Sequence, residues 1–253
     1  MFTGVAVRAD GLSLKGGHGW VYREVTAEAA PGVLTAVAGQ AGSGRTSLLL
    51  TLAGRMKPTS GTLTVAGRHT PRTIRRVAAL GLVDGVNDLE PALSVAEHLR
   101  ERARGPLGSR RGGRQETRAG AALELAGLER SPGDRTLVRA LDREQRVRLG
   151  LALALLDEPG LLVLDNVDTG LDAGRRAALW ATLTELAALG LTIFAACTEP
   201  PEPHEPHGLP AAPEPPEVPE PPQAGGTLET TTTPGDAKAR PVETLRLPGQ
   251  EER

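Results

Sequence analysis

Apolar residues along the first 198 positions form short continuous runs that are separated by segments with helical spacing. Continuous runs bounded by glycine or aspartate predict buried strands, here at 33–38 (VLTAVA), 79–84 (ALGLVD), 161–165 (LLVLD) and 191–196 (LTIFAA). The segment 61–67 (GTLTVAG) alternates apolar and polar residues, which predicts a strand of a small antiparallel layer. The spacing predicts helices from Thr46 to Gly54, over 94–103 and 115–128, from Asp142 (as N-cap) to Leu156, and over 173–189.

Strands and helices alternate in this order, which predicts an α/β fold with a mostly parallel sheet. The run LLVLD is apolar throughout, as expected for a parallel strand that is covered on both faces. Residues 85–156 are rich in helical spacing, so we expect a helical subdomain there. No internal repeat is visible.

Composition divides the chain near residue 199. Of the 21 prolines, 14 lie beyond Thr198, and the charge is +5 for residues 1–198 but −7 for residues 199–253. A segment rich in proline and glutamate, with few large apolar side chains, cannot offset the entropy of ordering. We therefore expect one domain over 1–198 and a disordered or locally extended tail over 199–253, which we interpret as solubilising rather than as a docking motif.

Cysteine usage and hydropathy narrow the class of protein. Cys197 is the only cysteine, which excludes internal disulfides and thiolate metal clusters and fits a reducing compartment. No secretory signal is visible, and the longest apolar run, 149–156, is too short to span a bilayer. We expect a soluble, cytoplasmic protein. The arginines at 100–118 lack interleaved aromatic residues, which favours a solvated loop or an acidic partner over nucleic acid.

The segment 39–47 (GQAGSGRTS) has the spacing of a phosphate-binding loop and lies between a predicted strand and a predicted helix. Gly39, Gly42 and Gly44 permit backbone angles that are closed to other residues, so successive N–H groups converge on an anion. The positive end of the following helix adds to this cradle. Arg45 stands where such a loop has lysine. Its planar guanidinium cannot take the position of an ammonium between two phosphates, so we expect phosphate binding with weakened affinity.

Several motifs in this order resemble the ATP-binding subunit of ABC-type transporters, over about residues 4–198. GQAGSGRTS resembles the Walker A loop, SGTLTVAG the segment after its helix, LEPALSVAEHL the stretch after the Q-loop, and LLVLDNVDTGLD the Walker B strand and D-loop. The resemblance implies a P-loop NTPase fold of ABC type. The family's further strand or two after the last helix–strand unit is not evident, and the proline-rich tail occupies its place.

The resemblance also implies ligands and partners. It implies ATP and Mg²⁺, a membrane-embedded permease subunit, a second nucleotide-binding subunit in a homo- or heterodimer, and a position peripheral to the inner membrane through a partner. Thr46 would bind magnesium through its hydroxyl, and Asp165 would hold a water bound to that magnesium. The nucleotide site implied by the resemblance comprises Gly39, Gly42, Ser43, Gly44, Arg45, Thr46, Ser47 and Asp165.

The groups that perform or sense hydrolysis depart from the family pattern. Asn166 stands at the position of the catalytic glutamate, and an amide cannot accept a proton, which typically costs about 10²–10⁴ in rate. Thr198 stands at the position of the switch histidine. Asp84 replaces the Q-loop glutamine, a magnesium ligand and relay to the membrane subunit, and an aspartate can still bind magnesium. Asp168 is interpreted as a turn-forming residue rather than as a substitute base.

The segment 141–145 (LDREQ) occupies the place of the family's LSGGQ signature, whose donors face the γ-phosphate held by the opposing subunit. Asp142 and Glu144 would bring two carboxylates toward an anion. We therefore interpret Asp142 as a helix cap, with Arg143 and Glu144 in a solvated first turn. The aromatic residue that stacks on adenine is expected near Gly16. Trp20 and Tyr22 lie slightly later, and core packing is an equal interpretation for either.

Three hypotheses follow. The leading one is a subunit that binds Mg-ATP and hydrolyses it slowly or not at all, so that its standing as an enzyme is undecided. The second is a regulatory or scaffold subunit that does not usefully bind nucleotide, which Arg45 and the missing aromatic favour. The third is a working ATPase with Asp168 or Asp84 as an unrecognised base.

Overall fold

The computed structural model describes residues 1–103, 115–128, 135–200 and 242–247. Its strands are β1 (Val7–Gly16), β2 (Gly19–Ala29), β3 (Leu34–Ala38), β4 (Ser60–Val65), β5 (Ala78–Leu80), β6 (Leu161–Leu164), β7 (Thr192–Cys197) and β8 (Glu243–Arg246). Its helices are α1 (Arg45–Leu52), α2 (Pro71–Ile74), α3 (Val95–Ala103), α4 (Gln115–Leu125), α5 (Arg143–Leu155) and α6 (Ala173–Ala188), with a 3₁₀ turn η1 at Val138–Ala140.

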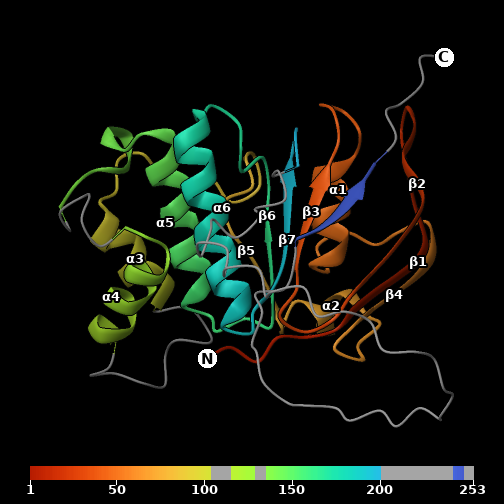
Figure 1. Cartoon of the computed structure of the whole chain (residues 1–253), viewed down its shortest axis with the longest axis horizontal. Helices are drawn as coiled ribbons and strands as arrows, with labels where there is room; N and C mark the ends of the chain where they lie inside the picture. Colours follow the sequence, from red (N-terminus) through yellow and green to blue (C-terminus); the bar gives the residue numbers. More distant parts are fainter. Residues whose placement is uncertain (104–114, 129–134, 201–241, 248–253) are drawn as a thin grey trace, which may run out of the picture.

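The strands form two sheets, which confirms the predicted α/β fold with a parallel sheet and a small antiparallel layer. The larger sheet has the strand order β5-β6-β7-β3-β8, and its neighbouring strands are parallel. The smaller sheet has the order β2-β1-β4 and is antiparallel. In Figure 1 helices α5 and α6 lie on one side of the larger sheet, and α1 and the smaller sheet lie on the other.

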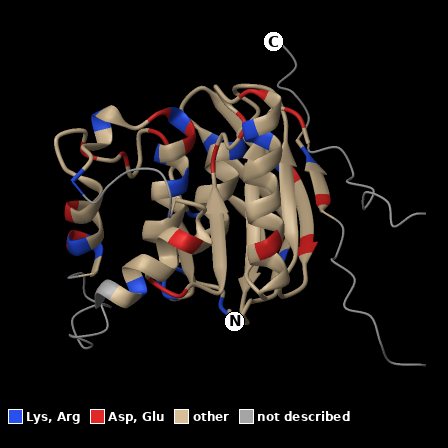
Figure 2. Ribbon diagram, turned by 60° about the vertical axis from the view of Figure 1, so that its left-hand side comes forward, with Lys and Arg blue, Asp and Glu red and all other residues tan. Residues whose placement is uncertain are grey.

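Strands β3, β6 and β7 are buried along their length because both faces of the larger sheet are covered. On one face, Val37, Val163 and Phe194 belong to a core cluster with residues of α1 and the smaller sheet. On the other, Leu162 and Ile193 belong to a cluster with residues of α5 and α6. Figure 2 shows the central strands free of charged residues. A third cluster joins α3 to η1 and α5, and it holds the helix-rich part together.

The sequence pattern does not predict the hairpin of β1 and β2. The pairing register of these strands shifts between Ala9 and Leu12 and again between Leu12 and Leu14. Such bulges break the alternation of apolar and polar positions on which a strand prediction depends. Among the described residues, no helix is long and apolar enough to cross a membrane.

Strand β8 shows that the prediction of a disordered tail over 199–253 is wrong for residues 243–246. It pairs in parallel with β3, where Thr35 faces Glu243 and Ala38 faces Arg246. The physical reason is local: Val242, Leu245 and Leu247 bring apolar side chains against the two main clusters, within a region whose average composition is polar. The rest of the predicted tail, 201–241 and 248–253, lies outside the described residues.

We predict that replacing Leu247 with alanine lowers the free energy of unfolding by at least about 2 kcal/mol, because a buried leucine leaves a cavity. Leu247 is 7% exposed. Arg246→Ala, an exposed change on the neighbouring residue, should alter it by less than about 0.5 kcal/mol. Urea unfolding of both full-length variants measures the difference. Equal small effects would show that β8 adds nothing to the core.

Candidate functional site

The glycine-rich loop lies where β3 ends and α1 begins, at the carboxyl edge of the parallel sheet. Gly44 is the N-cap of α1 and has the left-handed backbone angles φ 86°, ψ 8°. A Cβ at this residue would collide with the backbone carbonyl of Val21, so the hairpin of β1 and β2 supports the loop from behind. The N–H of Gly39 donates to the carbonyl of Cys197 over 3.3 Å, which ties the loop to β7. Gly42 also has positive φ, at 83°.

The central contact of the site joins Thr46 to Asp165. The hydroxyl of Thr46, in the first turn of α1, donates to Oδ2 of Asp165 over 2.6 Å. Asp165 follows β6 directly and is 4% exposed. Burial raises the pKa of its carboxyl above the ordinary value, while the Thr46 hydrogen bond and the charge of Arg45 lower it. Two of the predicted nucleotide-site residues, 119 positions apart, are thus in direct contact.

Arg45 folds back toward the end of β6 instead of into solvent. Its side chain is buried, and Nη2 donates to Oδ1 of Asn166 over 3.3 Å. Asn166 has φ 48°, in the left-handed region that asparagine tolerates better than most residues. Arg45 and Asn166 belong to separate motifs of the sequence, and nothing in their spacing predicts that they touch.

Three buried polar atoms in this site have no hydrogen-bond partner among the described residues: Oγ of Ser43, Nη1 of Arg45 and Oδ1 of Asp165. Buried polar atoms are almost always paired in folded proteins, so this group fits a polar ligand with both acceptor and donor oxygens. The chemistry suits phosphate and a hard cation. The part of the chain that the structure describes holds no cluster of three histidine, cysteine or acidic residues for a metal. A bound Mg²⁺ would therefore take most of its ligands from phosphate and water.

Ser47 and Thr198 make little side-chain contribution to this arrangement. Ser47 is half-buried, and its carbonyl accepts a hydrogen bond from the hydroxyl of Thr51 over 2.8 Å. Thr198 is exposed just after β7. Its N–H and that of Glu199 donate to Oδ2 of Asp168, over 2.7 and 3.2 Å. Asp168 is therefore an anchor between the segments that follow β6 and β7, in line with its interpretation as a structural residue.

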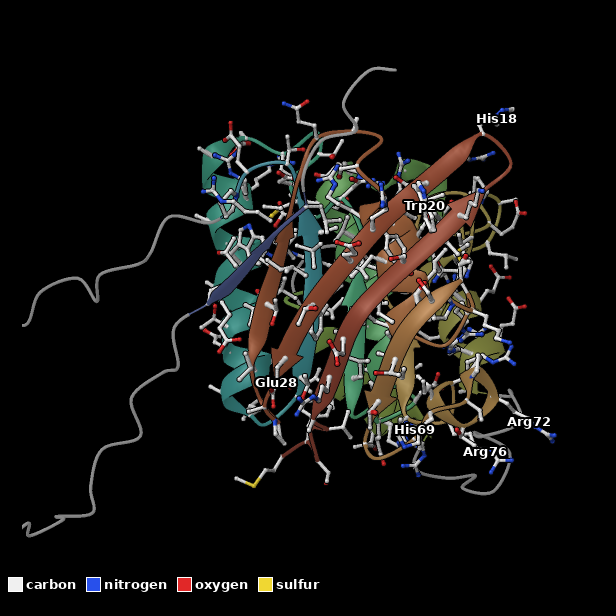
Figure 3. The ribbon with its side chains drawn as sticks, turned by 90° about the vertical axis from the view of Figure 1, so that its right-hand side faces the viewer. His18, Trp20, Glu28, His69, Arg72 and Arg76 are labelled. Atoms are coloured by element: carbon white, nitrogen blue, oxygen red, sulfur yellow. The ribbon has the colours of Figure 1, made fainter. Side chains whose placement is uncertain are left out.

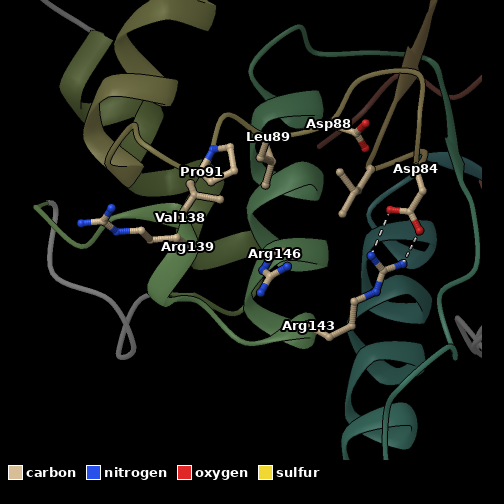
Figure 4. A pocket seen from close by; sticks show the side chains of 9 residues that line it. Asp84, Asp88, Leu89, Pro91, Val138, Arg139, Arg143 and Arg146 are labelled. Carbon is tan, nitrogen blue, oxygen red and sulfur yellow. Dashed lines mark hydrogen bonds and ion pairs between the residues drawn. The ribbon is translucent and has the colours of Figure 1, made fainter.

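Asp84 does not join Thr46 and Asp165 through a hydrogen bond. Its two carboxylate oxygens accept from Nη1 and Nη2 of Arg143, over 3.0 and 3.1 Å, in a bidentate ion pair (Figure 4). Arg143 begins α5, in the segment that occupies the signature position. The two altered positions of the family pattern therefore bind each other within one chain.

Asp142 caps α5 as predicted, and it forms a capping box with Gln145. Arg143 and Glu144 lie in the first turn of α5, as predicted, but both are only partly exposed. Glu144 is only 18% exposed at its side chain and accepts from the buried Arg148 over 2.8 Å. Nη1 of Arg175, from α6, binds Asp142 over 2.9 Å, and its Nε lies 3.7 Å from Glu144. The i,i+4 spacing of Glu144 and Arg148 within α5 could have indicated their pair, whereas the contacts of Arg175 could not be predicted because it lies in another helix.

The two candidate aromatic residues differ in exposure. Tyr22 is buried, and its hydroxyl shares a 2.7 Å hydrogen bond with that of Thr51 on α1, so it packs behind the loop. Trp20 is 37% exposed, and Figure 3 shows it near His18 at the tip of the hairpin. Lys15 and Arg23 place cations 5.8 and 5.2 Å from its ring centre. Gly16 has no side chain to contribute.

Most of the basic cluster predicted at 100–118 lies outside the described residues. At its ends, Arg102 pairs with Asp157 over 2.6 Å and Arg118 with Glu158 over 2.9 Å. A pocket of about 340 Å³ lies beside Asp84, in the loop that follows β5 (Figure 4). It is lined by apolar, acidic and basic residues: Leu82, Asp84, Asp88, Leu89, Pro91, Val138, Arg139, Arg143 and Arg146.

A family model described as "ABC transporter" matches residues 22–169. Nod factor export ATP-binding protein I of Cupriavidus metallidurans is 36% identical over 167 residues, 66% of this chain and 54% of that protein. The protein of that name from Rhizobium johnstonii is 33% identical over 75% of this chain and 60% of its own length. Fe(3+) ions import ATP-binding protein FbpC 3 of Rhodococcus jostii is 34% identical over 68% and 49%. The chain therefore spans about half the length of these relatives.

Solved structures share the fold. The cbiO1 structure from Clostridium perfringens superposes with a TM-score of 0.65 at 23% identity, over 76% of this chain and 78% of that one. A bacterial Atm1-family ABC exporter with ATP bound gives a TM-score of 0.62 at 18% identity, over 79% of this chain and 35% of that one. The fold predicted from the motifs is thus confirmed.

We predict that Cys197, although it lies beside the glycine loop, resists alkylation in the native protein. Burial, and to a smaller extent the charge of Asp168, raises the pKa of its thiol to about 12, while Arg45 acts in the opposite direction. At pH 8 the native thiolate fraction is then about 10⁻⁴, against roughly a quarter for an ordinary thiol of pKa ~8.5. Iodoacetamide labelling should be at least about a thousandfold slower than in denaturant at the same pH. Comparable rates would contradict the burial of this thiol.

Proposed function

This chain belongs to the ABC transporter family, and from that premise we propose that it is an ATP-binding subunit that binds Mg-ATP and hydrolyses it slowly or not at all. The observation that carries the proposal is the contact of Thr46 with Asp165, next to three buried polar atoms that have no hydrogen-bond partner among the described residues. A ligand with phosphate oxygens and a cation would satisfy all three.

The loop and α1 supply the phosphate cradle. The N–H groups of the loop and of the first turn of α1 point toward an anion, and the helix dipole favours negative charge there. Thr46 and Asp165 would hold Mg²⁺, which when bound neutralises charge on the phosphates. Arg45 keeps a positive charge in the site in place of the family's lysine.

Slow hydrolysis would follow from the residue at the position of the family's catalytic glutamate. The amide of Asn166 can bind a water but cannot accept its proton, and a general base is worth about 10²–10⁴ in rate. Of the two proposed substitutes, Asp84 is held by Arg143. Asp168 accepts two backbone N–H groups at Oδ2, although its buried Oδ1 has no partner among the described residues. These contacts argue against a working ATPase that relies on either carboxylate.

The partner's site is also affected. The segment 141–145, which in the family lends donors to the opposing subunit, carries side chains that are bound within this chain by Arg175, Arg148 and Asp84. Pairing with an intact second subunit would therefore leave one composite site without a base and the other without signature donors. Bound nucleotide would hold the two subunits together without being hydrolysed rapidly.

We further propose that the membrane-embedded partner docks at the pocket beside Asp84. Asp84 takes the place of the family's relay to the membrane subunit. Apolar side chains such as Leu89 and Val138 form part of the wall, and Arg139 and Arg146 are exposed around it. A short segment with an apolar face and acidic residues suits this lining. The chain would then lie at the cytoplasmic side of a membrane through that partner.

A second candidate is a regulatory or scaffold subunit that does not use nucleotide. The guanidinium of Arg45 and the burial of Tyr22 favour it, because a guanidinium cannot take the position of the family's lysine between two phosphates and a buried ring cannot stack on adenine. Retention of nucleotide decides between the two candidates.

The test of the proposed function is the nucleotide retained by the purified chain after incubation with labelled ATP and Mg²⁺ and removal of free label. We expect retained ATP with little conversion. Labelled ADP accumulating at each cycle would restore an ordinary ATPase. No retained label, with the chain alone or beside its partner, would support the scaffold.

We predict that Mg-ATP at 100 times its Kd stabilises the chain by about 2.7 kcal/mol, seen as a rise in melting temperature.

Thr46→Val removes the hydroxyl that contacts Asp165 and should weaken Mg-ATP binding at least about tenfold, or ~1.4 kcal/mol. Thr169→Val is the matched control, since Thr169 is an exposed residue of a nearby loop. Identical shifts for both variants would place nucleotide binding elsewhere.

A further inference from the structure

The hydrogen bond between Arg45 and Asn166 connects the two positions at which the cradle and the catalytic centre depart from the family. We propose that Asn166 is a positioning residue for Arg45. Its neutral carbonyl holds one edge of the guanidinium and leaves the other edge, with its charge intact, for the terminal phosphate of ATP. This inference rests on the proposed binding of ATP at the 39–47 loop.

Arg45 has one terminal nitrogen that is hydrogen-bonded and one that is buried and unpaired. Nη2 donates to Asn166 over 3.3 Å, whereas Nη1 is buried without a partner among the described residues. A guanidinium carries five donors in a rigid fork, so fixing one nitrogen also fixes the direction of the other. The side chain is 7% exposed, which restricts its rotation further. A phosphate oxygen is the acceptor that such an edge fits best.

The backbone of Asn166 sets the other half of the contact. Its φ of 48° lies in the left-handed region, where asparagine is several-fold more common than most side chains. Asn166 follows Asp165 directly, and its backbone N–H hydrogen-bonds the carboxylate that contacts Thr46. Arg45 and Thr46 are likewise adjacent. The two residue pairs therefore form neighbouring bridges between the start of α1 and the end of β6.

The charge at position 166 decides what Arg45 can bind. A carboxylate there would form a bidentate, charge-assisted pair with the guanidinium, and this pair would compete with phosphate. The amide holds the group but neutralises nothing. A lysine at position 45 is a point charge on a flexible stem and cannot form the bidentate fork. The two departures therefore compensate for each other, and restoring glutamate at position 166 alone would weaken ATP binding.

The deciding experiment measures the Kd of Mg-ATP for the full chain and its variants by equilibrium titration. We expect Asn166→Glu to raise Kd about tenfold, a loss of ~1.4 kcal/mol. The double variant Arg45→Lys with Asn166→Glu should return to within about threefold of the wild type, since ammonium and carboxylate then no longer form a fork. Thr169→Glu adds the same charge to an exposed residue of the same loop and should change Kd less than about twofold.

A second cycle separates positioning from added repulsion. Asn166→Ala should raise Kd about fivefold in the wild type but leave it unchanged when Arg45 is already alanine, because the amide then has nothing to position. Equal effects of Asn166→Ala in both backgrounds, or no recovery in the lysine–glutamate double variant, would overturn the proposal. Thermal unfolding of every variant verifies that each is folded before its Kd is compared.

The outcomes also separate this inference from the proposed function. A wild type that binds no Mg-ATP overturns both. A wild type that binds Mg-ATP while Arg45 and Asn166 act independently overturns only the positioning role. Binding together with the two predicted couplings supports both.

Discussion

The hydrogen bond between Thr46 and Asp165 depends on the parallel register of the larger sheet, and the rest of the site depends on that bond. Strands β3, β7 and β6 are neighbours in this sheet, so the segments that follow them meet at one edge. The glycine loop follows β3, Asp165 follows β6, and Thr198 follows β7. Residues more than a hundred positions apart thus reach hydrogen-bond distance without any local propensity for it.

Burial makes the contents of this edge consequential. Asp165 and Arg45 are almost fully removed from water. In such a buried environment an unpaired polar atom costs free energy, and a contact between a charge and a dipole is strong. A protein that retains orphaned donors and acceptors here retains a preference for a ligand that supplies the missing partners. The proposed binding of Mg-ATP without rapid turnover rests on this combination of buried polar atoms and an amide at position 166.

The charged residues of the altered signature segment form ion pairs with other residues of the same chain. Asp142, Arg143 and Glu144 each have a partner in this polypeptide, from the loop after β5, from α5 or from α6. Surface pairs of this kind contribute little stability individually, and Arg143 with Asp84 is one of them. Together they join the helix-rich part of the chain to the nucleotide-binding core. The carboxylates of Asp142 and Glu144, which would repel the phosphate of a partner subunit, are thus bound by arginines of this chain.

The order of motifs along the sequence predicted the fold and led to the proposals about the cradle residues and the missing base, because glycine spacing, apolar runs and residue chemistry are local properties. Tertiary structure alone decided which residues touch. It brought Arg45 into contact with Asn166, Asp84 with Arg143, and Asp168 with the backbone N–H of Thr198. These pairs form only when parallel strands and separate helices align. It also revealed β8, whose few apolar residues gain stability only against β3 and the core. Pairing energies between distant residues leave no periodic trace in a single sequence.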